Sequence, residues 1–277
     1  MAKQRQTSNL TEQQKQFVKV LDQISYGQSS YETFRDFCEL SAISFVGVFI
    51  GGQEAKERLE RIHSKYGKDK IVLFGKAMDI LIDALETEYR DFLGEVYMAL
   101  DISNARSGQF FTPYCLCKMM SKMQLPEDLE KMIEDCGGYI TVNDCACGAG
   151  AMLIATVDEF KARKVDYSNK LFIVAQDIDL MCCYMAYIQL SLSGVAAMVV
   201  CGNTLTNEQR EVWYTPTYYL NYWTCKIALR NLKEIRTPEN VKPAEVVEAL
   251  PKPDIKVIKD SSGQFTFDFA AEIGAVA

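Results

Sequence analysis

The chain has 277 residues, of which 48% are hydrophobic and 24% are charged, and its formal net charge is −7. That length supplies core for one large domain or two modest ones, and the acidic balance excludes an extended basic surface, so any nucleic-acid contact must be local or supplied by a partner. The longest strongly apolar run, Leu40 to Ile50, is about half of a membrane span, and Met1 to Lys15 lacks the apolar core of a secretory signal, so we expect a cytoplasmic protein without membrane contact.

The positions of the cysteines and of the single histidine argue against disulfide bonds, a zinc site and catalysis by a histidine base. The ten cysteines lie in apolar runs, so we expect reduced and mostly buried thiols. Three close pairs lack the Cys-x-x-Cys spacing of zinc sites, and no metal site is predicted. These pairs are Cys115/Cys117, Cys145/Cys147 and Cys182/Cys183. The single histidine, His63, lies in a charged helical stretch, so any chemistry is expected to run without a histidine base.

The first part of the chain is predicted to be helical. Apolar residues recur at helical spacing from Phe17 to Ile24, from Phe34 to Ile43 and from Ile71 to Leu85. Acidic residues surround the apolar face of the third segment. We therefore predict a helical N-terminal region over residues 1–105, built as an antiparallel bundle with solvated faces.

From Gly108 onward, helices and strands alternate. The predicted elements are, in chain order, a helix from Thr112 to Met123 with Thr112 as N-cap, a strand over Tyr139–Val142, a helix over Ala149–Arg163, a strand over Leu171–Ala175, a helix over Leu180–Leu192 and a strand over Ala196–Val200. This order predicts a parallel sheet that binds ligands at the carboxyl ends of its strands. We assign residues 106–236 to this Rossmann-like domain.

The regular pattern fades beyond Thr206. A helix is predicted from Tyr218 to Glu234, and no strand is evident between Thr206 and Tyr214. Four prolines then mark an irregular extension over residues 237–277, with a short hairpin formed by Val257–Ile258 and Phe265–Phe267.

Three strand ends carry candidate ligand groups. Asp144 and the Cys147–Gly150 turn follow the first strand, where glycine lets backbone approach a ligand at a helix start. Asp177 ends the second strand, where a carboxylate can bind both hydroxyls of a ribose or cap the next helix. Asn203 follows the third strand and can pair with an adenine edge or serve as a turn residue.

Four sequence blocks in this region resemble a known family. They are Gly108-Gln109-Phe110-Phe111-Thr112-Pro113, Asp144 to Gly150 with Cys145 in place of the usual proline, Gln176 to Asp179, and Gly202 to Leu205. Their order is similar to that in the amino-methylating, adenine-specific DNA methyltransferases, such as the modification subunits of type I restriction-modification systems and their phage-borne relatives. The resemblance covers roughly residues 70 to 206.

The resemblance implies an α/β, Rossmann-like S-adenosylmethionine-dependent methyltransferase fold behind an α-helical N-terminal region. It implies that the chain binds S-adenosylmethionine and methylates the exocyclic amine of adenine in DNA, reached directly or through a partner subunit. The cofactor-binding residues implied by the blocks and strand ends are Phe110, Phe111, Thr112, Asp144, Cys147, Gly148, Gly150, Asp177 and Asn203.

The chain departs from the family where the base should bind. The family's fourth strand ends in a polar residue, two prolines and an aromatic residue, whereas this chain has no Pro-Pro dipeptide. The nearest candidate catalytic residues are Thr215, Pro216 and Tyr218, with Tyr219 as a second aromatic ring. These residues can also form an aromatic loop or helix start that packs under the site.

A missing fourth strand implies a truncated sheet whose first strand is an exposed edge. A homodimer or a complex is expected to cover that edge. Lys226, Arg230 and Lys233 share one helix face, either as a phosphate contact or as a solvated surface. Three functions remain open: a DNA adenine methyltransferase, a catalytically inactive cofactor-binding or interaction protein, and a transferase that methylates another nucleophile.

Overall fold

The computed structural model describes residues 9–25, 29–49, 52–100, 111–235, 256–259 and 265–268. The chain divides into two compact units, Met1–Lys226 and Ile227–Ala277. The first unit holds the N-terminal helices together with the sheet. The second begins within helix α11. The bounds of the three domains predicted from the sequence stay predictions, and each unit is described by itself below.

Four helices are described in the N-terminal part of the first unit. They are α1 (Glu12–Ile24), α2 (Ser30–Phe49), α3 (Gln53–Thr87) and α4 (Phe92–Ala99). Phe17 of α1 is fully buried and meets Phe37 of α2 and Phe92 of α4 edge to face, with ring centroids 5.1 and 5.4 Å away. The predicted helical region is confirmed for these residues. None of the described helices combines the length and apolar character needed to cross a bilayer.

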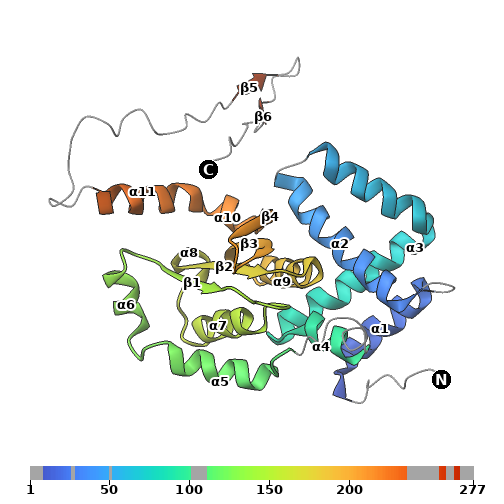
Figure 1. The fold of residues 1–277 in the computed structure, drawn as a ribbon, viewed down its shortest axis with the longest axis horizontal. Helices are drawn as coiled ribbons and strands as arrows, with labels where there is room; N and C mark the ends of the chain where they lie inside the picture. The colour runs from blue at the N-terminus through green and yellow to red at the C-terminus, as the bar shows by residue number, and fades with distance from the viewer. Residues whose placement is uncertain are drawn as a thin grey trace. The chain divides into compact units, whose positions relative to one another are not determined.

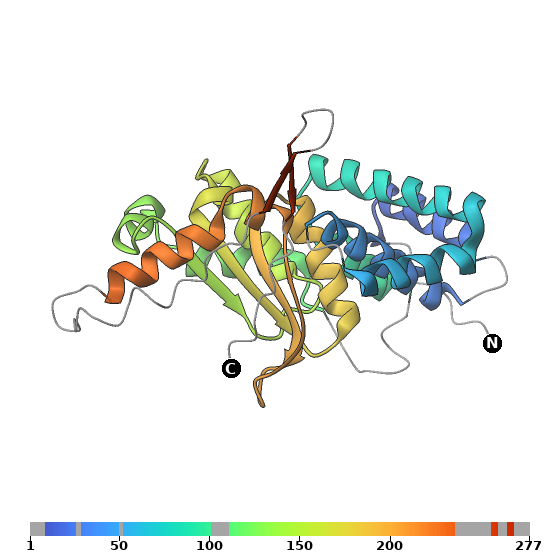
Figure 2. The same ribbon diagram turned by 90° about the horizontal axis from the view of Figure 1, so that it is seen from above.

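The main sheet follows, with its helices interleaved along the chain. Its strands are β1 (Ile140–Asp144), β2 (Leu171–Asp177), β3 (Ala196–Asn203) and β4 (Glu208–Tyr214), in that spatial order. The first three run parallel, as predicted, and are joined by α7 (Ala151–Ala162), α8 (Tyr167–Lys170) and α9 (Leu180–Leu192). Figure 2 shows the strands side by side. The register places the carboxyl ends of β1, β2 and β3 along one edge of the sheet, called the carboxyl edge below.

Strand β4 was not anticipated from the sequence. Glu208, Gln209 and Arg210 are polar and exposed, so the segment lacks the apolar signature of a buried strand. It returns antiparallel beside β3, and the two strands pass so closely at Gly202 that a Cβ there would lie 2.0 Å from the Glu208 carbonyl oxygen. The fourth strand therefore lies on the far side of the sheet from β1. Among the described strands, β1 remains an edge strand.

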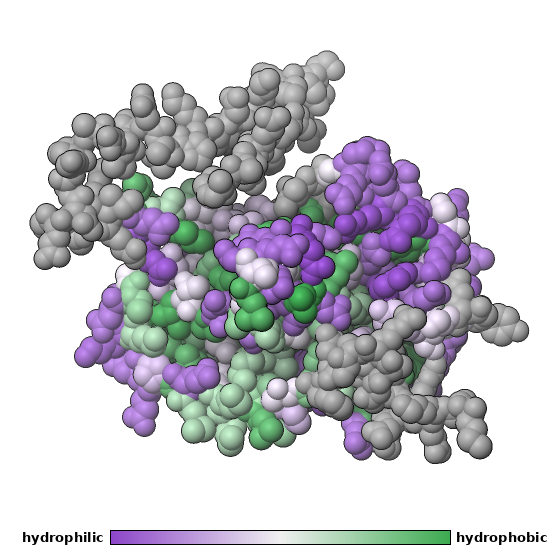
Figure 3. Space-filling model, in the orientation of Figure 1, coloured by the Kyte–Doolittle hydropathy of each residue, from purple (hydrophilic) through white to green (hydrophobic). Residues whose placement is uncertain are grey.

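The remaining helices of the first unit flank this sheet. They are α5 (Tyr114–Gln124), α6 (Leu129–Asp135), α10 (Pro216–Leu220) and the start of α11 (Trp223–Ile235). In Figure 1, α5 and α7 lie below the strands and α10 lies above them. Thr112 is not the N-cap of α5, because the cap position is Pro113 and no side chain caps that end. The α5 surface carries exposed Met119 and Met123, and Figure 3 shows apolar residues along the lower side of the molecule where Figure 1 places α5.

The second unit contains the predicted C-terminal hairpin. Strands β5 (Lys256–Lys259) and β6 (Phe265–Asp268) pair antiparallel, with Val257 opposite Phe267. The hairpin prediction is confirmed by this pairing.

Candidate cofactor site

The turn after β1 is built from glycines that adopt backbone conformations other residues avoid. Gly148 and Gly150 have φ values of +54° and +92°. Gly150 donates its N–H to the Cys147 carbonyl (2.9 Å) and is the N-cap residue of α7. A Cβ on Gly148 would lie 3.2 Å from the Phe111 ring, so the turn and Phe111 are in close contact. The residue type at Gly148 is therefore set both by backbone strain and by this packing.

Asp177 fixes the position of this turn. One of its carboxylate oxygens accepts the Gly148 N–H (2.9 Å) and the other accepts the Asp179 N–H (2.9 Å). The Cys147 N–H also donates to the Gln176 carbonyl (2.9 Å), so the turn is bonded to β2 twice. Asp177 is only 9% exposed. It does not cap α9, since Asp179 holds that position. Each carboxylate oxygen keeps acceptor capacity beyond these single bonds.

Asp144 and Cys147 complete the first strand end. The Asp144 carboxylate accepts the Ala146 N–H (3.1 Å), and burial raises the pKa of this carboxyl despite that bond. Burial, with the nearby Asp177 and Asp144 charges, also raises the pKa of the Cys147 thiol well above its ordinary value. A thiol of high pKa is a poor nucleophile, and the Cys147 side chain is buried in the hydrophobic core.

The end of β3 reaches the same edge. Asn203 accepts the Leu205 N–H through its side-chain oxygen (3.0 Å), which is the turn role that the sequence left open. The Thr204 hydroxyl donates to the Cys145 carbonyl (2.7 Å) and so joins the end of β3 to the turn after β1. The carboxyl edge thus brings Asp144, Asp177 and Asn203 to three strand ends that are linked to one another.

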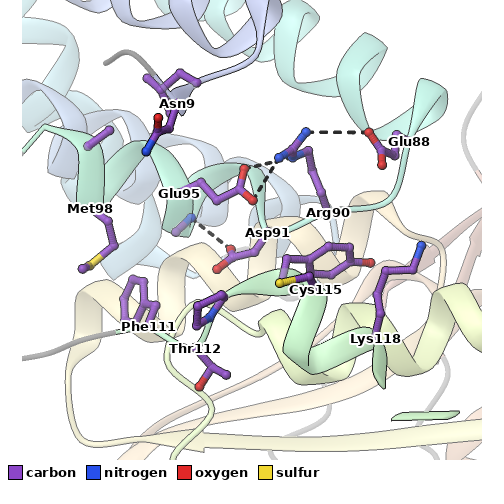
Figure 4. Close-up of a pocket in the computed structure, with 15 residues that line it drawn as sticks. Asn9, Glu88, Arg90, Asp91, Glu95, Met98, Phe111, Thr112, Cys115 and Lys118 are labelled. Atoms are coloured by element: carbon purple, nitrogen blue, oxygen red, sulfur yellow. Dashed lines mark hydrogen bonds and ion pairs between the residues drawn. The ribbon is translucent and has the colours of Figure 1, made fainter. Parts of the chain in front are cut away.

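Two cavities share Asp91, Phe111 and Thr112, and the smaller of them opens beside the glycine turn. The smaller one, of about 150 Å³, is lined by the turn, by Phe111 and Thr112, and by Asp91 at the start of α4. The larger one, of about 930 Å³, is shown in Figure 4 and shares these last three residues. Phe111 stacks on Tyr97 of α4, with ring centroids 5.7 Å apart. Of the predicted aromatic pair, Phe110 lies outside the described residues.

Asp91 and Gln189 were missed by the sequence analysis. Asp91 precedes an apolar helix and would be interpreted only as an N-cap, a role that it does fill by accepting the Gly94 N–H (3.0 Å). The Gln189 side chain is fully buried in α9 and donates to both the Asp91 carboxylate (3.0 Å) and the Ala149 carbonyl (2.9 Å). Its oxygen accepts the Leu93 N–H (3.0 Å). Gln189 therefore joins the N-terminal helices to the glycine turn.

The candidate catalytic residues lie elsewhere in the sheet. Thr215 accepts the Ala197 N–H (2.9 Å) and donates to the Val195 carbonyl (2.7 Å), which places it at the amino end of β3. Pro216 begins α10, and the Tyr218 ring stacks on Tyr214. The structure does not bring these residues to the carboxyl edge, because β4 runs antiparallel and returns the chain to the opposite end. Their geometry is that of a packing cluster, the alternative that the sequence left open.

Comparisons with known proteins identify a family for this chain. A family model described as N-6 DNA Methylase matches residues 88–229, about half of the chain. No curated protein sequence matches the chain. Among solved structures, it is similar to a protein of Listeria monocytogenes proposed to be a class I S-adenosylmethionine-dependent methyltransferase, with 15% identity and a TM-score of 0.39. The match covers 69% of this chain and 53% of the other, so this chain spans about half the length of that structure.

Proposed function

Because this chain belongs to the N-6 DNA methylase family, we propose that it binds S-adenosylmethionine at the carboxyl edge and methylates the exocyclic amine of adenine in DNA. The family implies S-adenosylmethionine as the cofactor. The observation that carries the proposal is the glycine turn, which Asp177 bonds to β2 and which opens onto the cavity lined by Phe111 and Thr112.

The residues at this edge fit the chemistry of the cofactor. S-adenosylmethionine carries a ribose, an adenine and a positively charged sulfonium. Asp177 stands at the β2 end with acceptor capacity for ribose hydroxyls, and Asn203 stands at the next strand end with an amide. The carboxylates of Asp91, Asp144 and Asp177 surround the turn and give it a negative potential suited to a cation.

The main contribution of the protein to this reaction is to position the two reacting groups. When bound, the cofactor supplies an electrophilic methyl group on its sulfonium. The protein must then hold the adenine amine in line with that methyl group and exclude water, and such alignment supplies most of the rate. A base inside a duplex must be flipped out to reach the site. We propose that DNA, reached directly or through a partner subunit, is the substrate.

A second function is favoured by a specific observation. The sequence has no Pro-Pro dipeptide, and Thr215, Pro216 and Tyr218 lie at the amino end of the sheet. These facts favour a protein that binds the cofactor but does not by itself transfer the methyl group. The base-binding residues would then come from a partner or be absent.

The assembly and setting of the protein are also proposed. We place it in the cytoplasm, as part of a restriction-modification system. The edge of β1 presents backbone groups that no described strand pairs, and a second copy of the chain or a partner subunit is expected to cover them. The net charge of −7 agrees with a partner that supplies the basic DNA-binding surface.

The two functions are separated by a transfer assay. Full-length protein is mixed with S-adenosylmethionine labelled on its methyl group and with unmethylated duplex DNA. Label in N6-methyladenine supports the methyltransferase. Cofactor binding without labelled adenine supports the second function, and absence of binding contradicts both. Asp177→Ala should abolish binding, whereas the matched control Asp166→Ala should not, because Asp166 only caps the short helix α8 before β2.

A further inference from the structure

Asp91 is a buried carboxylate at the junction of the two cavities. It is 2% exposed and lines both of them. In Figure 4 its carboxyl group lies between the Arg90–Glu95 pair and Thr112. It belongs to α4 of the helical region, whereas the glycine turn belongs to the sheet. A ligand that fills the smaller cavity would therefore contact both parts of the first unit.

The Asp91 carboxylate is held in a fixed position. Its Oδ1 atom accepts from the Gly94 N–H and from the Gln189 amide, each at 3.0 Å. Gly94 is required there, because a Cβ would lie 2.1 Å from Asp91 Oδ2. Since Gln189 also donates to the Ala149 carbonyl, the carboxylate and the glycine turn are positioned by the same side chain. Such preorganisation is typical of a ligand contact.

Among the described residues no cation forms an ion pair with this carboxylate, although the nearby Arg90 charge lowers its pKa slightly against the effect of burial. Arg90, its neighbour in sequence, pairs with Glu95 (2.9 Å) and Glu88 (3.6 Å). Lys118, which also lines the larger cavity, pairs with Asp158 (2.9 Å). Burial accordingly raises the pKa of the Asp91 carboxyl to about 6, although the Gln189 and Gly94 bonds oppose the shift. A cationic ligand would stabilise the ionised form of such a buried carboxylate.

We propose that Asp91 binds the α-ammonium group on the methionyl tail of the cofactor. The assignment rests on the cofactor binding proposed above. Asp177 is bonded to Gly148, and Gly148 lines the smaller cavity together with Phe111, so a cofactor whose ribose binds Asp177 would extend its tail past Gly148 into that cavity. Asp91 is the carboxylate that α4 contributes to that cavity. It therefore selects ligands that keep a charged amino-acid tail.

The test compares two ligands that differ in that tail. S-adenosylhomocysteine keeps the amino-acid group, and 5′-methylthioadenosine keeps the adenosine but lacks it. Affinities of both for full-length wild type and Asp91→Asn are measured by calorimetry. We expect the substitution to weaken S-adenosylhomocysteine by about 10- to 100-fold, the range of a lost charged hydrogen bond, and to leave 5′-methylthioadenosine unchanged.

A control variant at Glu95 tests whether the effect is specific to Asp91. Glu95→Gln removes a carboxylate from the larger cavity that is already paired with Arg90, so the ratio of the two affinities should not change. If Asp91→Asn weakens both ligands equally, or neither, the assignment of Asp91 is wrong while cofactor binding stands. If wild type binds neither ligand, the proposed function fails as well. The melting temperature of Asp91→Asn should not fall, because an asparagine oxygen can still accept both bonds.

Discussion

The amino end of β3 and the carboxyl edge of the sheet hold their polar side chains in opposite ways. At the amino end, the hydroxyl of the fully buried Thr215 both donates and accepts a hydrogen bond, so its polar atoms are satisfied by backbone. At the carboxyl edge, the carboxylates of Asp91, Asp144 and Asp177 surround a glycine turn and cavity, and the described residues place no ion pair on them. Fully satisfied polar groups stabilise a fold, whereas uncompensated charges beside a cavity indicate ligand binding.

The largest loss of stability is expected from a substitution at the amino end of β3. Thr215→Ala would leave the buried Ala197 N–H and Val195 carbonyl without their side-chain partner, and should lower the free energy of unfolding by about 2 to 4 kcal/mol. Urea unfolding measures this loss. Thr215→Ser keeps the hydroxyl and should lose much less. If the folded alanine variant lost affinity for S-adenosylhomocysteine, the amino end would take part in binding and the comparison would fail.

At Asp91, in contrast, a substitution is expected to raise the free energy of unfolding at neutral pH. Its carboxyl pKa is about 6 in the folded chain against an ordinary value of 3.8, so the folded state holds the proton more tightly. Wild type should therefore lose stability as the pH rises from about 4 to about 6, by roughly 3 kcal/mol at most. Asp91→Asn should remove this loss and be more stable than wild type at pH 7. Urea unfolding of both proteins at pH 4.5, 5.5 and 7 measures it, and parallel pH profiles would refute it.

A smaller loss of stability is expected at the glycine turn, where two variants distinguish backbone strain from ligand binding. Gly148→Ala and Gly67→Ala both place a side chain at positive φ, which costs about 1 to 2 kcal/mol each. Gly67 has open space around it and lies in a kink of α3, so it is the matched control. Only Gly148→Ala should also weaken S-adenosylhomocysteine in a binding titration. Equal affinities in the two variants would place the ligand away from the turn.

The smallest expected effect is at Thr204. Its hydroxyl joins the end of β3 to the Cys145 carbonyl at an exposed position, so Thr204→Ala should cost about 0.5 to 1 kcal/mol. Thermal unfolding measures that loss, with Thr206→Ala as a neighbouring hydroxyl variant that lacks the link between strands. A larger loss would mean that the link between the two strand ends is central to the fold.

Local patterns predicted much of the fold. The helix over Leu180–Leu192 and the starts of β2 and β3 agree with the structure, because their continuous apolar runs are buried in the core. Strand β4 could not be predicted in this way, since its first residues are polar and exposed. The direction of β4 then decided where Thr215 lies. Sequence order gave no information about that direction.

The candidate site was predictable in part. The sequence predicted that Asp144, Gly148, Gly150 and Asp177 lie together, because glycine turns and strand-end carboxylates have a recognisable spacing, and the structure brings them to the carboxyl edge. Asp91 was not, because its role depends on Gln189, which is 98 residues away in sequence and contacts it only in the folded chain. Contacts between elements that are distant in sequence leave no local pattern.

We propose that the carboxyl edge binds the cofactor and that the amino end of β3 only supports the fold. Calorimetric titration of S-adenosylhomocysteine into wild type, Asp177→Ala and Thr215→Ser tests it most directly, with circular dichroism to confirm that each variant is folded. We predict one site per chain in wild type, no measurable binding in Asp177→Ala and unchanged affinity in Thr215→Ser. Wild-type affinity in a folded Asp177→Ala variant, or no binding to wild type, would contradict the claim.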